Sequence, residues 1–367
     1  EIFCSKGCVT HCTFCHRFNK GIRIIPPDIV ITRIKKLIKR FNVGVIFFSD
    51  ECFGASVKWL CEFCELIKPL NLLWRVSGMR VKGVNPDIIK MMKEAGCRSI
   101  IYGMETGSEK MLQVMEKKVA LEDNYNAMRW TIESGLYTDP QLVIGMPGET
   151  QETITETADF VAFAKTLNQS QNPKQISINY SQALPGTPLY EYGRNKGLMG
   201  ITTEEEEQYL LAVSNMDAAE GIKTINFTDY PCLIMLSWPW FIRSIVNYRY
   251  VKEFGIQHYY KMIFQEEMQK GILHILKNGS LSDIFYRYPV LVYKIRHFLW
   301  IIKLMNIFRT KGFVFAIVLL RECLAFIIKK RRKRFSFEYK SLRKIVDQDI
   351  KKAYAGTKEM VSLRKGR

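Results

Sequence analysis

The sequence lacks an apolar run that could span a bilayer. Its most apolar stretch, residues 312–328, is interrupted by Arg321 and Glu322 and is shorter than the ~20 residues that a spanning helix needs. The N-terminus has no basic region leading into an apolar core, which would be typical of an export signal. No internal repeat is present. These absences argue against a membrane-spanning, exported or repeat protein, and we expect a cytoplasmic chain.

Acidic residues are scarce in the last third of the chain. Residues 231–367 hold 28 Lys and Arg against 9 Asp and Glu, a net charge of +19. Residues 1–230 hold 26 against 27, a net charge of −1. Such asymmetry indicates that the C-terminal third meets something anionic, which leaves a membrane surface, a nucleic acid and an acidic partner as alternatives.

Disulfides are not expected, although the chain of 367 residues has 10 cysteines, because no export signal is visible. Cys61 and Cys64 form a C-x2-C pair inside a helical pattern without a second pair, which favours buried structural thiols. The first residue is Glu1 rather than Met, so we expect a fragment or a processed product.

Short apolar segments alternate with helical patterns through the first half of the chain, which predicts an α/β fold with a parallel sheet. The predicted strands are residues 43–49, 72–79, 99–103, 141–144 and 175–180. The predicted helices are residues 28–41, 56–67, 86–95, 108–116, 121–134 and 152–167. With a first strand at the N-terminus, this makes about six units, a partial (β/α)6 TIM-like barrel. We expect it to end near residue 230, before a mainly helical C-terminal region at 231–367.

Three cysteines follow one another as C-x3-C-x2-C at Cys8, Cys12 and Cys15. Three soft thiolates on one loop suit an iron–sulfur cluster, and a cubane cluster would keep one iron without a protein ligand. A structural zinc ion is the alternative, with His11 or His16 as its fourth ligand. An electron-transfer ferredoxin would normally use four cysteines.

The cysteine motif, with Phe14 before its last cysteine, resembles the signature of the radical S-adenosylmethionine (SAM) superfamily. Further segments resemble the cobalamin-dependent branch in order and spacing. They are residues 47–53, 74–80, 91–97, 102–109, 144–150 and 184–190. The match covers about residues 1–230.

The resemblance implies a [4Fe-4S] cluster bound by Cys8, Cys12 and Cys15, with SAM on the open iron. Reduction would cleave SAM, and the 5′-deoxyadenosyl radical would abstract a hydrogen from substrate. An electron donor such as flavodoxin or ferredoxin is then expected. The branch normally carries a cobalamin-binding domain ahead of the barrel, which this chain lacks, so cobalamin use is a hypothesis about the full-length protein. Methylation, cyclisation and rearrangement stay open as reactions, and no catalytic residue is assigned beyond the cluster.

Acidic residues follow two predicted strands, at the edge where barrels keep their sites. Asp50 or Glu51 would accept a hydrogen bond from the methionine amino group, or would cap the next helix. Glu105 would contact the ribose or the amino group, and an ordinary loop acid is the alternative. Arg80 would pair with the ligand carboxylate, or with Glu105.

Two further residues are expected near the adenine. Phe14 would pack against it, and simple core packing is equally compatible with the sequence. Gly145 would shape the loop beneath it.

The basic C-terminal region, residues 231–367, is rich in aromatic residues and ends in a block of Lys and Arg at 329–334. This composition favours peripheral contact with a membrane and would suit a lipid-like or other small-molecule substrate. A helical cap with a solvated tail is the alternative, and an RNA substrate is less favoured. For the whole chain, the alternative to a radical SAM enzyme is a non-catalytic iron–sulfur or zinc-binding interaction protein, or an RNA-modifying radical SAM enzyme.

Overall fold

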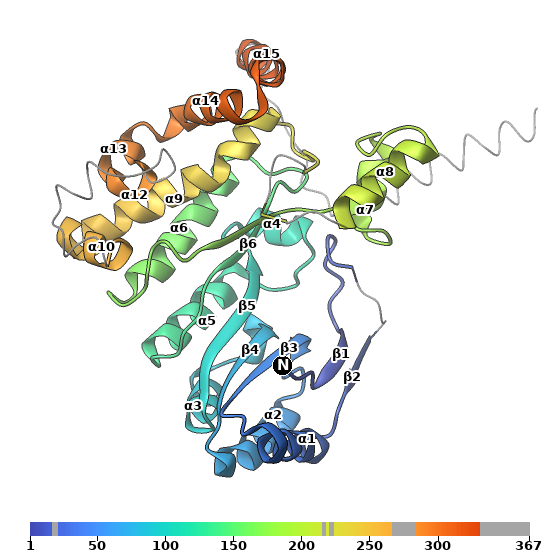
Figure 1. Cartoon of the computed structure of the whole chain (residues 1–367), viewed down its shortest axis with the longest axis vertical. Coiled ribbons are helices and arrows are strands. Elements are labelled where there is room, and N and C mark those ends of the chain that lie inside the picture. Colours follow the sequence, from blue (N-terminus) through green and yellow to red (C-terminus); the bar gives the residue numbers. More distant parts are fainter. Residues whose placement is uncertain (17–20, 215–217, 220–223, 266–283, 331–367) are drawn as a thin grey trace, which may run out of the picture.

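The computed structural model describes residues 1–16, 21–214, 218–219, 224–265 and 284–330. Five parallel strands form one sheet in chain order, with helices packed around it (Figure 1). The strands are β3 (Val45–Phe53), β4 (Leu73–Met79), β5 (Cys97–Glu105), β6 (Gln141–Ile144) and β7 (Ser177–Tyr180). All five strands predicted from the apolar segments are confirmed, and the predicted α/β class with them.

Alternating burial along β3 shows why this segment is a strand. Ile46 and Phe48 are buried, whereas Val45 and Phe47, which alternate with them, are exposed. This is the two-residue period of a strand. The ring of Phe48 lies 5.4 Å from that of Phe63 in the following helix and 5.7 Å from that of Trp74 in β4. These edge-on aromatic contacts join the first two strands of the sheet to the helix between them.

The six helices predicted between the strands are also present, with small differences at their ends. They are α1 (Pro27–Phe41), α2 (Val57–Ile67), α3 (Pro86–Glu94), α4 (Glu109–Val114), α5 (Leu121–Glu133) and α6 (Gln151–Thr166). Local chemistry defines several starts: the side chains of Ser56, Asn85 and Thr150 accept hydrogen bonds from the backbone of the first turns of α2, α3 and α6. Such caps satisfy amides that the helix itself leaves unpaired.

The N-terminal strand differs from the prediction of a sixth parallel unit. β1 (Ser5–Cys8) pairs antiparallel with β2 (Gly21–Ile24), and only Ile2 forms a parallel bridge to the sheet, at Phe48. The reason is that the amides of Cys4 and Ser5 donate to the Asp50 side chain instead of to a neighbouring strand. The sheet of the described residues therefore has five parallel strands, and no pairing in the described part of the chain closes it into a barrel.

The C-terminal helices pack on the far side of α6 from α5 (Figure 1). They are α9 (Cys232–Phe254), α10 (Ile256–Ile263), α12 (Ile284–Arg287), α13 (Pro289–Lys294), α14 (Leu299–Lys311) and α15 (Phe313–Lys330); α7 (Pro188–Asn195) and α8 (Thr203–Ser214) precede them. Buried side chains of α9, among them Leu236 and Ile242, join the same core as the sheet. The boundary at residue 230 stays a prediction. Residues 331–334 of the basic block lie outside the described residues.

Candidate active site

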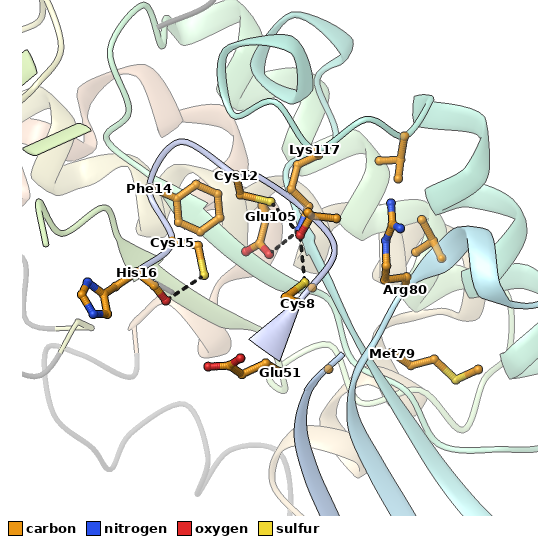
Figure 2. A pocket seen from close by; sticks show the side chains of 15 residues that line it. Cys8, Cys12, Phe14, Cys15, His16, Glu51, Met79, Arg80, Glu105 and Lys117 are labelled. Carbon is orange, nitrogen blue, oxygen red and sulfur yellow. Dashed lines mark hydrogen bonds and ion pairs between the residues drawn. The ribbon is translucent and has the colours of Figure 1, made fainter. Parts of the chain in front are cut away.

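The three cysteines lie on one loop that begins where β1 ends. Cys8 is the last residue of β1, and Cys12 and Cys15 follow it (Figure 2). The Thr10 hydroxyl oxygen lies 3.0 Å from Sγ of Cys8 and 3.7 Å from Sγ of Cys12. The motif thus brings its thiols to one place, as the sequence predicts.

Thr13, between the second and third cysteines, fastens this loop to two helices. Its amide and its hydroxyl donate to the carbonyl oxygens of Met115 and Val114, each at 3.0 Å. Its carbonyl accepts from the amide of Leu189 in α7, also at 3.0 Å. Thr13 is fully buried. Sequence reasoning missed this tether because its partners lie far away along the chain.

The thiols open into a pocket with a volume of about 240 Å³. Four more of the predicted site residues line it: Phe14, Glu51, Arg80 and Glu105 (Figure 2). The remaining lining residues are Thr10, His16, Gly78, Met79, Val81, Gly103, Lys117 and Val119. The carboxyl ends of β3, β4 and β5 supply the side of the pocket that faces the cysteine loop, and this is the edge where barrel-type folds place their sites.

The pocket contains a nearly buried ion pair. Lys117 Nζ lies 2.9 Å from Oε1 of Glu105, and their side chains are 14% and 12% exposed. The predicted alternative of an Arg80 pair is therefore wrong, because the salt bridge of Glu105 is to Lys117. Burial lowers the pKa of Lys117, but the Glu105 carboxylate and the Cys12 thiolate outweigh it and hold the pKa above its usual range. A charged Lys117 thus lies beside the cysteines.

Backbone conformation holds Glu105 in this position. Its φ is +65°, a left-handed conformation that non-glycine residues rarely adopt and that concentrates at functional sites. A Cβ on Gly103 would lie 2.7 Å from Oε1 of Glu105, so a larger residue there would displace the carboxylate from this position. Lys117 itself was missed by sequence reasoning, since it follows α4 and not a strand.

Asp50 lies beneath β1 and does not line the pocket. Its Oδ1 accepts hydrogen bonds from the amides of Cys4 and Ser5 and from the Ser5 hydroxyl. Burial raises the pKa of Asp50 in spite of these bonds. The predicted alternative of a helix cap is wrong for both Asp50 and Glu51, because Ser56 caps α2, accepting from the amide of Trp59 at 3.3 Å. Asp50 instead ties the strand that carries Cys8 to the sheet.

Gly145 also lies outside the pocket lining, in the loop after β6. Its φ is +85°, and its amide donates to the carboxylate of Glu149. Burial raises the pKa of Glu149 to about 8. The Ser181 hydroxyl donates to the Gly145 carbonyl at 2.9 Å. Gly145 shapes this loop, and its position beneath an adenine stays a prediction.

The environment of the motif differs from thiol to thiol. Hydrogen bonds from Cys52 and Thr10 outweigh burial and lower the pKa of Cys8 to about 5. Burial, together with the neighbouring Cys12 and Cys8, raises the pKa of Cys15 to about 11. Since the thiolate is the form that binds metal, the environment of Cys8 favours metal binding more than that of Cys15 does.

The donor set fits a cluster. Three thiols share one wall, and cationic side chains nearby compensate the negative charge of thiolates and sulfide. His16, a predicted zinc ligand, has Nδ1 2.8 Å from the carbonyl oxygen of Pro185. Within the described ranges, no three His, Cys, Asp or Glu side chains are arranged to hold a single metal ion. A cubane cluster does not need such an arrangement, because its cysteines bind different irons.

Comparison with known proteins identifies the fold that carries this pocket. Residues 2–161 match the family model of the radical SAM superfamily. That family uses a [4Fe-4S] cluster and SAM. The match includes the three cysteines and every residue that lines the pocket.

Curated relatives of this chain include a methyltransferase and a cyclase. An uncharacterized methyltransferase of Pyrococcus horikoshii is 29% identical over 54% of this chain and 42% of its own length. The anaerobic magnesium-protoporphyrin IX monomethyl ester cyclase of Rubrivivax gelatinosus is 31% identical over 42% of this chain and 28% of its own. The chain thus spans less than half the length of either. Among solved structures, the radical SAM methyltransferase TsrM of Kitasatospora setae, with cobalamin and a [4Fe-4S] cluster bound, aligns with a TM-score of 0.45 and 19% identity over 54% of this chain and 37% of that one.

Proposed function

Because the chain carries a radical SAM domain in residues 2–161, we propose that it is the catalytic part of an enzyme that cleaves SAM reductively and modifies a small molecule by radical chemistry. Cys8, Cys12 and Cys15 would hold the [4Fe-4S] cluster. When bound and reduced, the cluster supplies the electron that converts SAM to methionine and a 5′-deoxyadenosyl radical.

One observation carries the proposal: the three thiols of the motif share a pocket with two carboxylates and two cations. SAM presents an amino group, a carboxylate and a sulfonium, so a pocket that binds it needs charges of both signs. The pocket wall is mostly apolar elsewhere, with Met79, Val81 and Val119. Such a lining would keep water away from the site, and a carbon radical needs this protection.

The pocket residues divide by charge in their proposed roles. Glu51 would accept hydrogen bonds from the methionine amino group, and Glu105 from the ribose or the amino group. Arg80 and Lys117 would pair with the methionine carboxylate. Asp50 is left out of this set because its carboxylate is committed to β1.

Phe14 serves both of its predicted roles in this scheme. It lines the pocket, where it would contact the adenine, and it packs against the cluster of buried residues that includes Met111, Met146 and Leu189. Gly145 does not line the pocket, so it would contribute indirectly, by shaping the loop after β6.

The radical chemistry requires a reductant, for which we propose a flavodoxin or ferredoxin. Methylation and cyclisation are the reactions that the relatives' names support. Cobalamin use is proposed for the full-length protein, with a lipid-like or other small molecule as substrate and peripheral contact of residues 231–367 with a membrane. Equal turnover of the full-length enzyme with and without cobalamin would exclude the dependence.

Anaerobic reconstitution tests the central claim. The chain is loaded with iron and sulfide, reduced with dithionite and given SAM, and 5′-deoxyadenosine is measured by chromatography. We expect 5′-deoxyadenosine and a change in the electron paramagnetic resonance spectrum of the reduced cluster when SAM is added. An intact cluster that neither responds to SAM nor yields 5′-deoxyadenosine would contradict the proposal.

A further inference from the structure

An apolar stripe runs along the outer side of α14. Ile301, Met305 and Phe308 are 40%, 63% and 51% exposed. Their spacing of three and four residues places them on one face of a helix. In a helix on the surface of a globular protein, this outer face would be polar.

The next helix, α15, has the same organisation. Ala316, Leu319 and Cys323 are buried and define its inner face. Val314 and Val318, on the opposite face, are 77% and 51% exposed. Ile317, Leu324 and Ile328 on this outer face are also exposed. Both faces of α15 are therefore apolar, although only one is covered.

The two exposed surfaces meet at the turn between the helices. The ring of Phe308 in α14 lies 5.8 Å from that of Phe313 in α15. Both helices lie at the edge of the molecule, with α9 between them and the sheet (Figure 1). We call the exposed apolar residues of α14 and α15 the outer patch. Its size exceeds the scattered single apolar residues normal on a surface, so it indicates a binding site.

Positive charge surrounds the outer patch. Residues 284–330 contain nine Lys and Arg against a single acid, Glu322. Arg309 and Lys311 are exposed at the end of α14, and Arg321 is exposed on α15. Long basic side chains of this kind reach polar headgroups while apolar neighbours enter the layer below.

The length of the helices decides how such a surface would meet a bilayer. No helix among the described residues is long and apolar enough to cross one. A pair of short helices with an apolar outer face and basic flanks would lie instead in the interface, parallel to the membrane plane.

We propose that the outer patch of α14 and α15 docks the protein on an anionic membrane surface. This inference deepens the peripheral contact proposed for residues 231–367 by naming its face and the headgroup charge it selects. It is independent of the radical chemistry, since docking needs neither the cluster nor SAM. A failure of docking would leave the radical function untouched.

Vesicle flotation of the full chain tests the docking. The two probes are vesicles of phosphatidylcholine alone and vesicles in which a third of the lipid is phosphatidylglycerol. We expect binding to the second and at least tenfold weaker binding to the first. Replacing Met305, Val314 and Val318 together by Glu should weaken binding at least tenfold. A matched control is Leu211→Glu on α8, which changes a residue 68% exposed and should bind as the unchanged chain does.

A second variant separates charge from apolar contact. Arg309→Gln with Lys311→Gln should lower the affinity for anionic vesicles by about 30-fold, since each basic residue contributes about 1 kcal/mol. Both sites are exposed, so we expect this variant to fold normally. Circular dichroism melting checks that the triple variant folds. Absence of vesicle binding, or equal binding to both vesicle types, would overturn the proposal. The proposal would also be wrong if the unchanged chain did not bind vesicles but bound RNA or formed oligomers, and if the triple variant lost that RNA binding or oligomer formation.

Discussion

The α/β part and the C-terminal helices α14 and α15 differ in how they place large apolar side chains. In the α/β part, residues such as Phe48 and Trp74 are fully enclosed, and Lys117 is paired with Glu105 inside the pocket. In α14 and α15, large apolar side chains remain exposed among basic residues. The first region encloses a pocket that can hold a small ligand. The second presents the apolar surface that we propose contacts a membrane.

The helix starts of the two regions differ in the same sense. α2, α3, α6 and α7 begin at residues whose side chains accept backbone hydrogen bonds. α9, α10, α13 and α14 have no side-chain cap, and neither do α1 and α4 of the α/β part. Side-chain caps therefore define some helix starts of the α/β part and none of these four starts in the C-terminal region.

The largest effect is expected from replacing a cysteine of the motif, which should abolish cluster chemistry in the α/β part without affecting the C-terminal helices. Cys12→Ser should abolish cluster retention and 5′-deoxyadenosine formation, because an alkoxide is a poor substitute for a thiolate on iron. Iron content and product are measured after reconstitution, with Cys61→Ser on α2 as the matched control that keeps both. Flotation on anionic vesicles should be unaffected. Product formation by Cys12→Ser at the unchanged level would remove this cysteine from the cluster.

The next effect concerns the ion pair in the pocket. Glu105→Gln keeps the shape of the side chain but leaves Lys117 without its carboxylate, so SAM should bind about 10- to 100-fold more weakly. Equilibrium binding to the cluster-loaded chain measures this, and Glu122→Gln, an exposed acid of α5, is the control. An unchanged dissociation constant would mean that the pair is only structural.

A pH effect is expected from Glu149, a buried acid in the loop after β6 of the α/β part. Its pKa is raised to about 8 by burial, above its value in an unfolded chain, so the folded state binds this proton more tightly. Its contribution to stability is present at low pH and is lost as pH rises from about 5 to about 8. Urea unfolding at several pH values should show this loss. Glu149→Gln should flatten the profile, and equal slopes in both proteins would refute the assignment.

The smallest effect tests the role of the caps. Ser56→Ala removes the acceptor for the Trp59 amide and should lower the free energy of unfolding by about 1 kcal/mol. Denaturant melts measure the change, with Ser214→Ala at the end of α8 as a control that should cost less. No change would indicate that packing alone sets the start of α2.

Much of the site was predictable because the motif spacing and the strand-end rule act locally. Cys8, Cys12 and Cys15 are close in sequence, and Glu51 and Glu105 lie at the ends of predicted strands, where parallel strands meet at one edge. Lys117 was not predictable in this way, because it reaches the pocket from a loop after α4. The role of Asp50 was not predictable either, because its side chain ties β1 to the sheet in place of strand pairing.

By itself, the sequence determined the periodic elements, the thiol spacing and the division between a neutral first part and a basic last part. These are properties of neighbouring residues, and local backbone preferences and charge counts express them directly. Tertiary structure alone decided which charges meet. It pairs Glu105 with Lys117 rather than with Arg80, places Asp50 under the cysteine strand, and leaves the outer patch uncovered. Each depends on contacts between distant segments, whose geometry only the packed chain defines.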